Sequence, residues 1–333
     1  MISFHQVIFF LPQTHFFSII IVGEKSMEVK KDDIAKDLRV VASVYNIVMK
    51  PFKLQVKEPK KKTIEVKKPK SMGPVKSIYI PRKDESGLRL LVIDSKKRKS
   101  RMGVLWIHGG GYVNGFPEMA FITMAKEISK KCLVVSPSYR LASSYPYPAA
   151  LEDCYTTLLW MHEHADELGI DKDKFAVGGE SAGGGLTVAL CLLARDRKEV
   201  NVMLQMPIYP MLDCRSDTKS MEDNNAPVWN EKSNIEAWNI YLRDIDKDNV
   251  PYYASPALCD NYAHMPPCIS FVGDIEPFRD ETVTYINRLK EVGIPTDFAI
   301  FNGCYHGFDI IAPGSKEAKE AKQFFINALD KYL

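Results

Sequence analysis

One short stretch of the chain has the spacing of a serine nucleophile. "GGESAGG", at residues 178–184, contains Gly179-Glu180-Ser181-Ala182-Gly183 and so fits the pattern G-x-S-x-G. In that pattern a strand turns sharply into a helix, and small neighbours let the chain pass while the serine is strained. Apolar "FAVGG" precedes the serine and "LTVALCLLAR" follows it, as a strand and a helix would. We predict that Ser181 is a nucleophile at the sheet edge; the alternative is a solvated serine in a glycine-rich turn.

A second glycine-rich stretch could supply an oxyanion hole. "LWIHGGGY", residues 105–112, reads as a strand that runs into His108 and three glycines. Successive glycines let backbone N–H groups face a ligand closely, and the N–H of Ala182, after the serine, would join them. A triple glycine alone is also typical of a flexible turn. We expect His108 to tie down this loop rather than to act as a base.

A serine nucleophile needs a base, and one histidine is well placed for that role. The sequence holds seven histidines: His5, His15, His108, His162, His164, His264 and His306. His306, in "NGCYHGF", follows an expected strand and lies in a loop between two glycines, where a base would reach the same sheet edge. The alternative is a buried core histidine. His162 and His164 lie on a helix of mixed polarity and are expected at the surface.

The acid of such a site has two candidates in "FVGDIEPFRDE", residues 271–281. A triad acid accepts a hydrogen bond from the base, so it should lie in the loop after a core strand. Asp280 and Glu281 start the next helix, where acidic residues are favoured in the first turn. Asp274 directly follows the strand, whereas Glu276 precedes Pro277, which restricts the backbone of Glu276 to an extended form. The residue types alone leave Asp274 and Glu276 open.

Apolar runs alternate with helical patterns along most of the chain. Eight runs are expected as strands: "SIYI", "LRLLVID", "GVLWIHGG", "CLVVSPSY", "KFAVGG", "NVMLQMPIY", "CISFVG" and "DFAIFNG". Helices are expected over roughly 32–49, 149–168, 185–195, 281–292 and 315–333. Ser315 is a candidate N-cap, and Gly293 a candidate residue just after a helix. This alternation predicts a mostly parallel sheet covered on both faces. Residues 213–253 are polar and are interpreted as an insertion over the sheet edge. Residues 53–76, near the start of the chain, are interpreted as a lysine-rich linker.

The order of these motifs is similar to that of the hormone-sensitive-lipase-like α/β-hydrolases, which include many bacterial carboxylesterases. "HGGGY", "SYRLASSYPYPAALEDC", "GGESAGG", "PFRDE" and "HGF" follow one another as in that family, over roughly residues 27–333. The resemblance implies an α/β-hydrolase fold: a mostly parallel eight-stranded sheet with helices on both faces and a helical cap. It implies one domain at 27–333, with the cap formed by about 27–55 and about 213–253.

The resemblance also implies roles for individual residues. Ser181 would be the nucleophile and His306 the base. Glu276 occupies the place of the family's acid, directly before Pro-Phe-Arg-Asp-Glu, and Asp274 is the second choice. The oxyanion donors would be the backbones of Gly110, Gly111 and Ala182, with Gly109 in support. The family uses no metal and no organic cofactor.

Two departures from the family pattern stand out. The family's "YRLAPE" reads Tyr139-Arg140-Leu141-Ala142-Ser143-Ser144 in this chain, which loses a proline and an acidic residue. This change bears on the geometry of a loop and not on the expected reaction. The family's acid is most often aspartate, whereas Glu276 stands in its place.

Composition limits the partners. Among 333 residues, hydrophobic types make up 46% and charged types 26%, which suits a full-sized core. A net charge of +2 gives no basis for nucleic acid as a partner. The seven cysteines form no C-x-x-C motif, which indicates free thiols in a reducing compartment and neither a disulfide framework nor a zinc site. We expect a cytoplasmic protein whose partner is a small-molecule ester; a homo-oligomer stays open.

Residues 1–26 read as a leader outside the hydrolase pattern. "VIFFLPQTHFFSIIIV", residues 7–22, is apolar but interrupted, and no lysine or arginine precedes it as in a signal peptide. Three readings remain: a weak membrane anchor, a disordered extension, or a segment that is not native. The first would give weak membrane association. We expect the residues before Met27 to be dispensable.

These features together predict a serine hydrolase that cleaves carboxylic esters of short to medium acyl chain through an acyl-enzyme. Trp229, Trp238 and Tyr112 are expected to narrow the acyl site. An amidase or formamidase would use the same residues. A ligand-binding receptor on the same fold, like the gibberellin receptors of plants, is the alternative without catalysis. Such receptors typically lack the catalytic histidine, which this chain has in His306.

Overall fold

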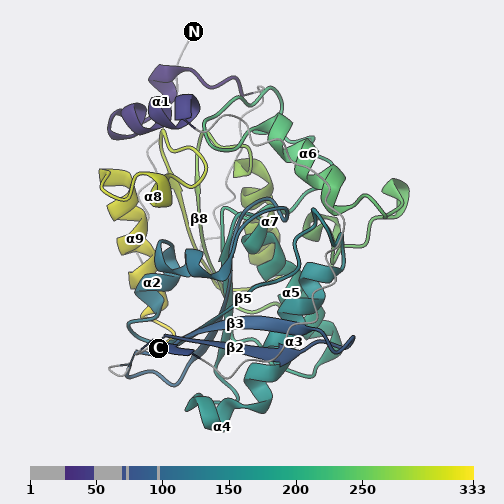
Figure 1. Cartoon of the computed structure of the whole chain (residues 1–333). Coiled ribbons are helices and arrows are strands. Elements are labelled where there is room, and N and C mark those ends of the chain that lie inside the picture. Colours follow the sequence, from purple (N-terminus) through teal and green to yellow (C-terminus); the bar gives the residue numbers. More distant parts are fainter. Residues whose placement is uncertain (1–26, 49–69, 73–74, 96–97) are drawn as a thin grey trace.

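A twisted, mostly parallel sheet forms the centre of the molecule (Figure 1). The computed structural model describes residues 27–48, 70–72, 75–95 and 98–333. Within these ranges the sheet has nine strands in the order β1-β2-β3-β5-β4-β6-β7-β8-β9. The strands are β1 (Lys70–Met72), β2 (Val75–Pro81), β3 (Gly87–Ile93), β4 (Gly103–Ile107), β5 (Leu133–Pro137), β6 (Phe175–Glu180), β7 (Leu204–Ile208), β8 (Cys268–Gly273) and β9 (Thr296–Phe301).

The eight expected strands correspond to β2 through β9. Strands β4 to β9 pair in parallel, whereas β1, β2 and β3 pair with their neighbours in antiparallel fashion. The ninth strand, β1, lies in the segment at 53–76 that was expected to be a lysine-rich linker, most of which is outside the described residues. Lys70 pairs with Ser77 and Met72 with Val75, so the end of the lysine-rich segment adds one short edge strand.

The expected helices are present, with shifted ends. The helices are α1 (Arg39–Val48), α2 (Met124–Ile128), α3 (Ala149–Glu163), α4 (Ala165–Leu168), α5 (Ala182–Arg197), α6 (Glu231–Tyr241), α7 (Arg279–Glu291), α8 (Phe308–Ile311) and α9 (Lys316–Leu329). The first expected helix begins later than predicted, because 3-10 turns occupy 31–33 and 36–38. The Ser315 hydroxyl caps α9 by accepting from Ala318 N, and Gly293 follows α7 with φ of +78°.

Both faces of the sheet are buried at its central strands, β4 to β8, which explains why these strands are mostly apolar. Leu105 and Ile107 of β4 join a core with α3, α5 and α7, whereas Val104 and Trp106 join the opposite core with α2 and α9. Side chains of a strand alternate between faces, so a strand buried on both sides needs an unbroken apolar run. This layering directs the carboxyl ends of the parallel strands toward one edge.

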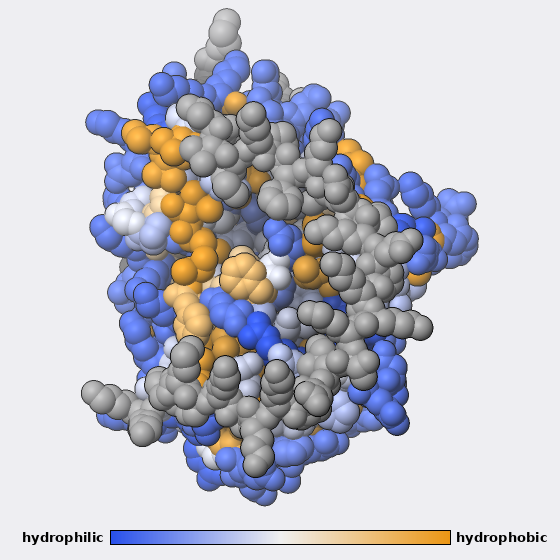
Figure 2. All heavy atoms as spheres, in the orientation of Figure 1, coloured by the Kyte–Doolittle hydropathy of each residue, from blue (hydrophilic) through white to orange (hydrophobic). Residues whose placement is uncertain are grey.

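Some of the elements outside the sheet lie together at one end of the molecule. Helices α1, α6 and α8 lie at the same end in Figure 1. The backbone of Met27 donates to the carbonyl of Glu222 at 2.9 Å, so the start of the described chain contacts the 213–253 segment. On the face of the molecule seen in Figure 2, a band of apolar side chains lies among hydrophilic ones. The large apolar side chains that are exposed include Val40, Val44, Phe116, Phe121 and Ile122.

Some expectations fall on residues that the structure does not describe. The leader at 1–26, its apolar stretch at 7–22 and the part of the expected cap at 49–55 lie outside the described residues. Among the helices in the described ranges, none has the length and apolar character needed to cross a membrane.

Candidate active site

Four strand ends bring the predicted residues to one edge of the sheet. The three glycines follow β4, Ser181 follows β6, Glu276 lies after β8 and His306 after β9. Strands β4 and β6 are neighbours, and so are β8 and β9. Because parallel strands end at the same edge, residues far apart in the sequence meet there. The fold therefore assembles the site from loops and not from any one segment.

Ser181 lies on a strained turn between β6 and α5. Its φ and ψ are +59° and −121°, a combination that few residues other than glycine adopt. The turn packs closely on β4: a Cβ atom added at Gly179 would lie 2.3 Å from the Ile107 carbonyl oxygen, and one added at Gly183 would lie 2.1 Å from the same atom. Both glycines of G-x-S-x-G are thus required by contact with the strand that carries the other glycine loop.

His306 joins the predicted nucleophile to the predicted acid. Its Nε2 lies 2.8 Å from Ser181 Oγ, and its Nδ1 pairs with Glu276 Oε2. Glu276 is fully buried, and Ser181 and His306 are nearly so. The other carboxylate oxygen, Oε1, accepts from the backbone N–H of Gly273 at 2.9 Å. The structure thus brings together three residues that lie 95 and 30 positions apart in the sequence.

Asp274, the second choice for the acid, points elsewhere. Its Oδ1 accepts from Gly303 N at 2.6 Å, so it holds the loop that presents His306. Burial raises the pKa of Asp274 to about 6, against the lowering effect of backbone hydrogen bonds from Gly303 and Cys304. The Asp274 side chain therefore holds the loop that carries His306, while Glu276 contacts His306 itself.

Asp280 and Glu281 form hydrogen bonds outside α7, in addition to occupying its first turn as predicted. Both are buried. Asp280 Oδ2 accepts from Ser220 N at 2.8 Å, and Glu281 Oε1 accepts from Leu212 N at 2.7 Å. The expectation that first-turn preference explains them is incomplete, because they bind the backbone of the segment after β7 to the helix that follows Glu276.

The glycine loop after β4 folds back on itself beside Ser181. Gly110 and Gly111 have φ of +115° and +59°, and the carbonyl of Gly110 accepts from Val113 N and Asn114 N. A Cβ atom at Gly109 would lie 3.2 Å from Ser181 Cβ. Successive left-handed glycines expose backbone N–H groups on the inner side of such a loop. The loop is therefore close enough to Ser181 to face a group bound to it.

His108 has the structural place that the sequence predicts. Its ring stacks on Tyr139 with centroids 4.1 Å apart, and the Tyr139 hydroxyl donates to the His108 carbonyl at 3.0 Å. Its Nδ1 lies 2.8 Å from the Gly109 carbonyl oxygen. Burial lowers the pKa of His108 to about 4, so this imidazole is neutral near pH 7. His162 and His164, expected at the surface, are half-buried against Phe175 and Trp160.

The three aromatic residues expected to narrow the site separate into two groups. Trp229 faces the site: a Cβ atom at Gly111 would lie 2.5 Å from its ring, whose centroid is 6.3 Å from that of His306. Tyr112 and Trp238 instead pack on each other and on Tyr241 and are buried. Trp229 is therefore the one of the three that lies beside the catalytic histidine candidate.

Two further aromatic rings, missed in the sequence, enclose His306. The Phe278 ring meets the imidazole edge-on at 5.1 Å, and the Tyr209 ring does so at 4.8 Å. Tyr209 follows β7 with φ of +33°, and its hydroxyl donates to Asp309 Oδ1 at 2.9 Å. Phe278 belongs to the "PFRDE" motif, whereas no local pattern marks Tyr209, because its contact is made across the sheet.

Glu180, the variable residue of the serine motif, is the last residue of β6 and is buried. Its Oε1 accepts from the indole N–H of Trp106 at 2.8 Å, and its side chain is 2% exposed. Burial raises the pKa of Glu180 to about 8, and the nearby Asp309 raises it further, while the hydrogen bond from Trp106 lowers it. Glu180 is thus mostly protonated at neutral pH.

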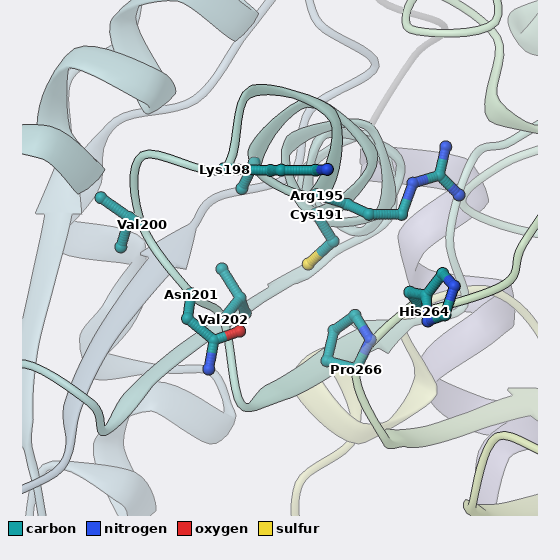
Figure 3. A pocket seen from close by; sticks show the side chains of 9 residues that line it. Cys191, Arg195, Lys198, Val200, Asn201, Val202, His264 and Pro266 are labelled. Atoms are coloured by element: carbon teal, nitrogen blue, oxygen red, sulfur yellow. The ribbon is translucent and has the colours of Figure 1, made fainter.

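A separate pocket lies at the far end of α5 from Ser181 (Figure 3). It encloses about 280 Å³, and it is lined by Cys191, Ala194, Arg195, Lys198, Val200, Asn201, Val202, His264 and Pro266. Helix α5 has 16 residues, so its ends are roughly 24 Å apart. Burial raises the pKa of the Cys191 thiol, which disfavours the reactive thiolate. The pocket therefore takes no part in chemistry at Ser181.

Comparisons with known proteins agree with this geometry. The profile of an α/β-hydrolase fold family matches residues 104–310. An arylesterase of Saccharolobus solfataricus is 36% identical over 221 residues, which cover 64% of this chain and 70% of the relative. The esterase LipI of Mycobacterium tuberculosis is 32% identical over 65% of this chain and 69% of its own.

A solved structure extends the likeness beyond the matched segment. A bacterial heroin esterase superposes with a TM-score of 0.74 and 26% identity, over 92% of this chain and 94% of that one. The superposition and the matched profile agree on one architecture. The chain belongs to the α/β-hydrolase fold family, in its hormone-sensitive-lipase-like branch of carboxylesterases.

Proposed function

We propose that this protein is a serine carboxylesterase that cleaves small-molecule esters of short to medium acyl chain. The observation that carries the proposal is the continuous hydrogen-bonded line from Ser181 Oγ through His306 to Glu276. A hydroxyl bound to a buried imidazole, which is itself bound to a carboxylate, is the arrangement that activates a serine for acyl transfer. The named esterases among its relatives support the same reaction.

The reaction follows from the positions of these atoms. His306 Nε2 removes the proton of Ser181 Oγ as the oxygen attacks the ester carbonyl, and Glu276 stabilises the imidazolium that forms. The backbone N–H groups of Gly110, Gly111 and Ala182 stabilise the negative oxygen of the tetrahedral intermediate, with Gly109 in support. His306 then donates its proton to the leaving alcohol. Water repeats the sequence on the acyl-enzyme and releases the acid.

We also propose that the N-terminal elements and the 213–253 segment form a cap over this site. Trp229 of that segment lies beside His306 and against Gly111, where it would limit the length of the acyl group. Met27 and Val29 bind the same segment, through Glu222 and Asn225. We place the enzyme in the cytoplasm, as the unpaired pattern of its cysteines suggests.

Two other activities would use the same fold. An amidase or formamidase would need only a different leaving group. A non-catalytic receptor is disfavoured by His306, because its contacts with Ser181 and Glu276 have no use in simple ligand binding.

A panel of p-nitrophenyl esters with acyl chains from acetyl to palmitoyl, together with matched p-nitroanilides, tests the proposal. We expect hydrolysis of the short esters, loss of activity by several orders of magnitude in Ser181→Ala, and labelling of Ser181 alone by a fluorophosphonate. An active Ser181→Ala protein, or labelling at another residue, would contradict a serine hydrolase. Faster cleavage of the anilides would favour the amidase.

A further inference from the structure

A second carboxylate lies close behind His306. Asp309 is 8% exposed and occupies the first turn of α8, three residues beyond the histidine. Its Oδ1 accepts from the Tyr209 hydroxyl at 2.9 Å. A buried carboxylate requires hydrogen-bonding partners, and Tyr209 provides one from another strand. The pair therefore links the loop that carries His306 to the end of β7.

Tyr209 connects this carboxylate to the imidazole. Its ring meets the His306 ring edge-on, with centroids 4.8 Å apart and an interplanar angle of 71°. The tyrosine is 1% exposed, and its backbone N–H donates to the Phe271 carbonyl at 3.0 Å. A ring held at both its backbone and its hydroxyl can restrict the orientation of the ring that it touches.

We propose that Asp309 is a positioning residue of the active site, which orients His306 through Tyr209 and favours the protonated imidazole by its negative charge. Its catalytic consequence rests on the proposed function, whereas its effect on the protonation of His306 does not. Both ring nitrogens of His306 have other partners, Nδ1 with Glu276 and Nε2 with Ser181, so Glu276 remains the acid that binds the imidazole.

The charges around Asp309 support this role. Burial raises the pKa of Asp309 to about 6, while the hydrogen bond from Tyr209 and the charge of His306 lower it and Glu276 raises it. Glu180 also interacts with Asp309, but its own pKa of about 8 keeps it mostly protonated at neutral pH. Asp309 is therefore mostly ionised above about pH 6.

Glu317, an acidic residue of the adjacent helix α9, raises the pKa of Cys304, which lies in the loop that carries His306. It is half-buried and lies in the first turn of that helix. The side chains that act on the protonation of Asp309 itself are Tyr209, His306 and Glu276, and Asp309 in turn raises the pKa of Glu180.

The effect of Asp309 on the reaction follows from proton transfer. When Ser181 attacks, its proton moves to His306 Nε2 and the imidazole becomes a cation. In a site of low dielectric, an anion that does not touch the cation still stabilises it. Asp309 would lower the energy of this state in addition to Glu276, without accepting the proton.

The test is an NMR titration of the histidine side chains in the full chain, for the wild-type protein and Asp309→Asn. Asparagine keeps an oxygen that can accept from Tyr209 but removes the charge. We expect the pH at which His306 is half protonated to be lower in Asp309→Asn than in the wild-type protein, because a nearby negative charge is lost. The acidic limb of kcat/KM for a p-nitrophenyl ester should move in the same direction. A His306→Ala variant identifies the resonance.

Two further variants complete the experiment. Asp260→Asn removes an exposed carboxylate and should leave the titration of His306 unchanged. Tyr209→Phe keeps the ring but removes the donor that favours ionised Asp309, so it should lower the same midpoint. The double variant should show no additional shift beyond Asp309→Asn.

An unchanged His306 midpoint in folded Asp309→Asn would overturn the proposal, whatever the ester assay shows. If Asp309→Asn does not fold, Tyr209→Phe decides alone: a lowered midpoint supports the proposal and an unchanged midpoint overturns it. Wild-type protein without ester hydrolysis would overturn the proposed function, and the titration would still decide this inference.

Discussion

Glu276 binds His306 with one carboxylate oxygen and its own loop with the other. Oε2 pairs with His306 Nδ1, while Oε1 accepts from the backbone N–H of Gly273 at 2.9 Å. Both oxygens of a buried acid are thus engaged, and the side chain has one orientation. Asp274, two residues earlier, is turned toward Gly303 instead.

The first prediction compares these two acids. Glu276→Gln keeps the shape but removes the charge that stabilises protonated His306, so we expect kcat to fall on the order of 10²- to 10⁴-fold. Asp274→Asn retains an oxygen that can accept from Gly303 and should lose less than about tenfold. Steady-state kinetics with a p-nitrophenyl ester measures both. The opposite ranking would make Asp274 the functional acid.

The second prediction concerns Trp229. Its ring lies against Gly111 and beside His306, so Trp229→Ala should open space for longer acyl chains. We expect the ratio of kcat/KM for octanoyl over butyryl p-nitrophenyl esters to rise at least about tenfold, the lower end of the effect of one methylene group in an apolar pocket. Trp160→Ala is the control, since Trp160 is also half-buried but stacks on His164. An unchanged ratio in Trp229→Ala would show that another residue limits the acyl chain.

The third prediction uses the pH dependence of folding. Burial raises the pKa of Glu180 to about 8, so the folded protein holds a proton that the unfolded chain releases near its ordinary value of 4.5. Stability from this group is therefore complete at low pH and is lost as pH rises toward about 8, by at most about 1.4 kcal/mol per pH unit. Glu180→Gln cannot ionise and should lack this loss.

Urea unfolding at pH 6 and pH 9 measures the difference. The free energy of unfolding of Glu180→Gln, relative to wild type, should be higher at pH 9 than at pH 6. Glu163→Gln, on the exposed side of α3, should show no such trend. A parallel response of Glu180→Gln and wild type would mean that Glu180 is already ionised in the folded protein.

The fourth prediction concerns a buried carboxylate beneath the "YRL" motif. Asp153 Oδ1 pairs with Arg82 Nε at 2.7 Å, and its Oδ2 accepts from the backbone N–H of Arg140 at 2.8 Å. Its side chain is 1% exposed, so Asp153→Ala should leave two arginines without their buried carboxylate and cost about 3–5 kcal/mol of unfolding free energy.

Denaturant unfolding tests this value against a surface pair. Asp166 lies 3.9 Å from Lys172 and its side chain is 86% exposed, so Asp166→Ala should change stability by less than about 1 kcal/mol. Equal effects of the two substitutions would show that burial does not strengthen the Asp153 pairs.

The parts of the site that the sequence determined are those set by local geometry. The turn at Ser181 needs small residues on both sides, and the five consecutive residues 179–183 show this pattern in the sequence. The alternation of apolar strands and helices likewise follows from which faces each element buries, so eight strands and the parallel sheet could be predicted. Short-range patterns were therefore enough to predict the fold and to propose Ser181 as the nucleophile.

The tertiary structure decided everything that depends on contacts between distant segments. Asp274 and Glu276 are separated by one residue, and only the position of the His306 loop selects between them. The burial of Asp280 and Glu281 depends on the segment after β7, which no helix-end preference predicts. Side-chain direction at a sheet edge is set by packing across strands, and packing of that kind leaves no periodic signal in one sequence.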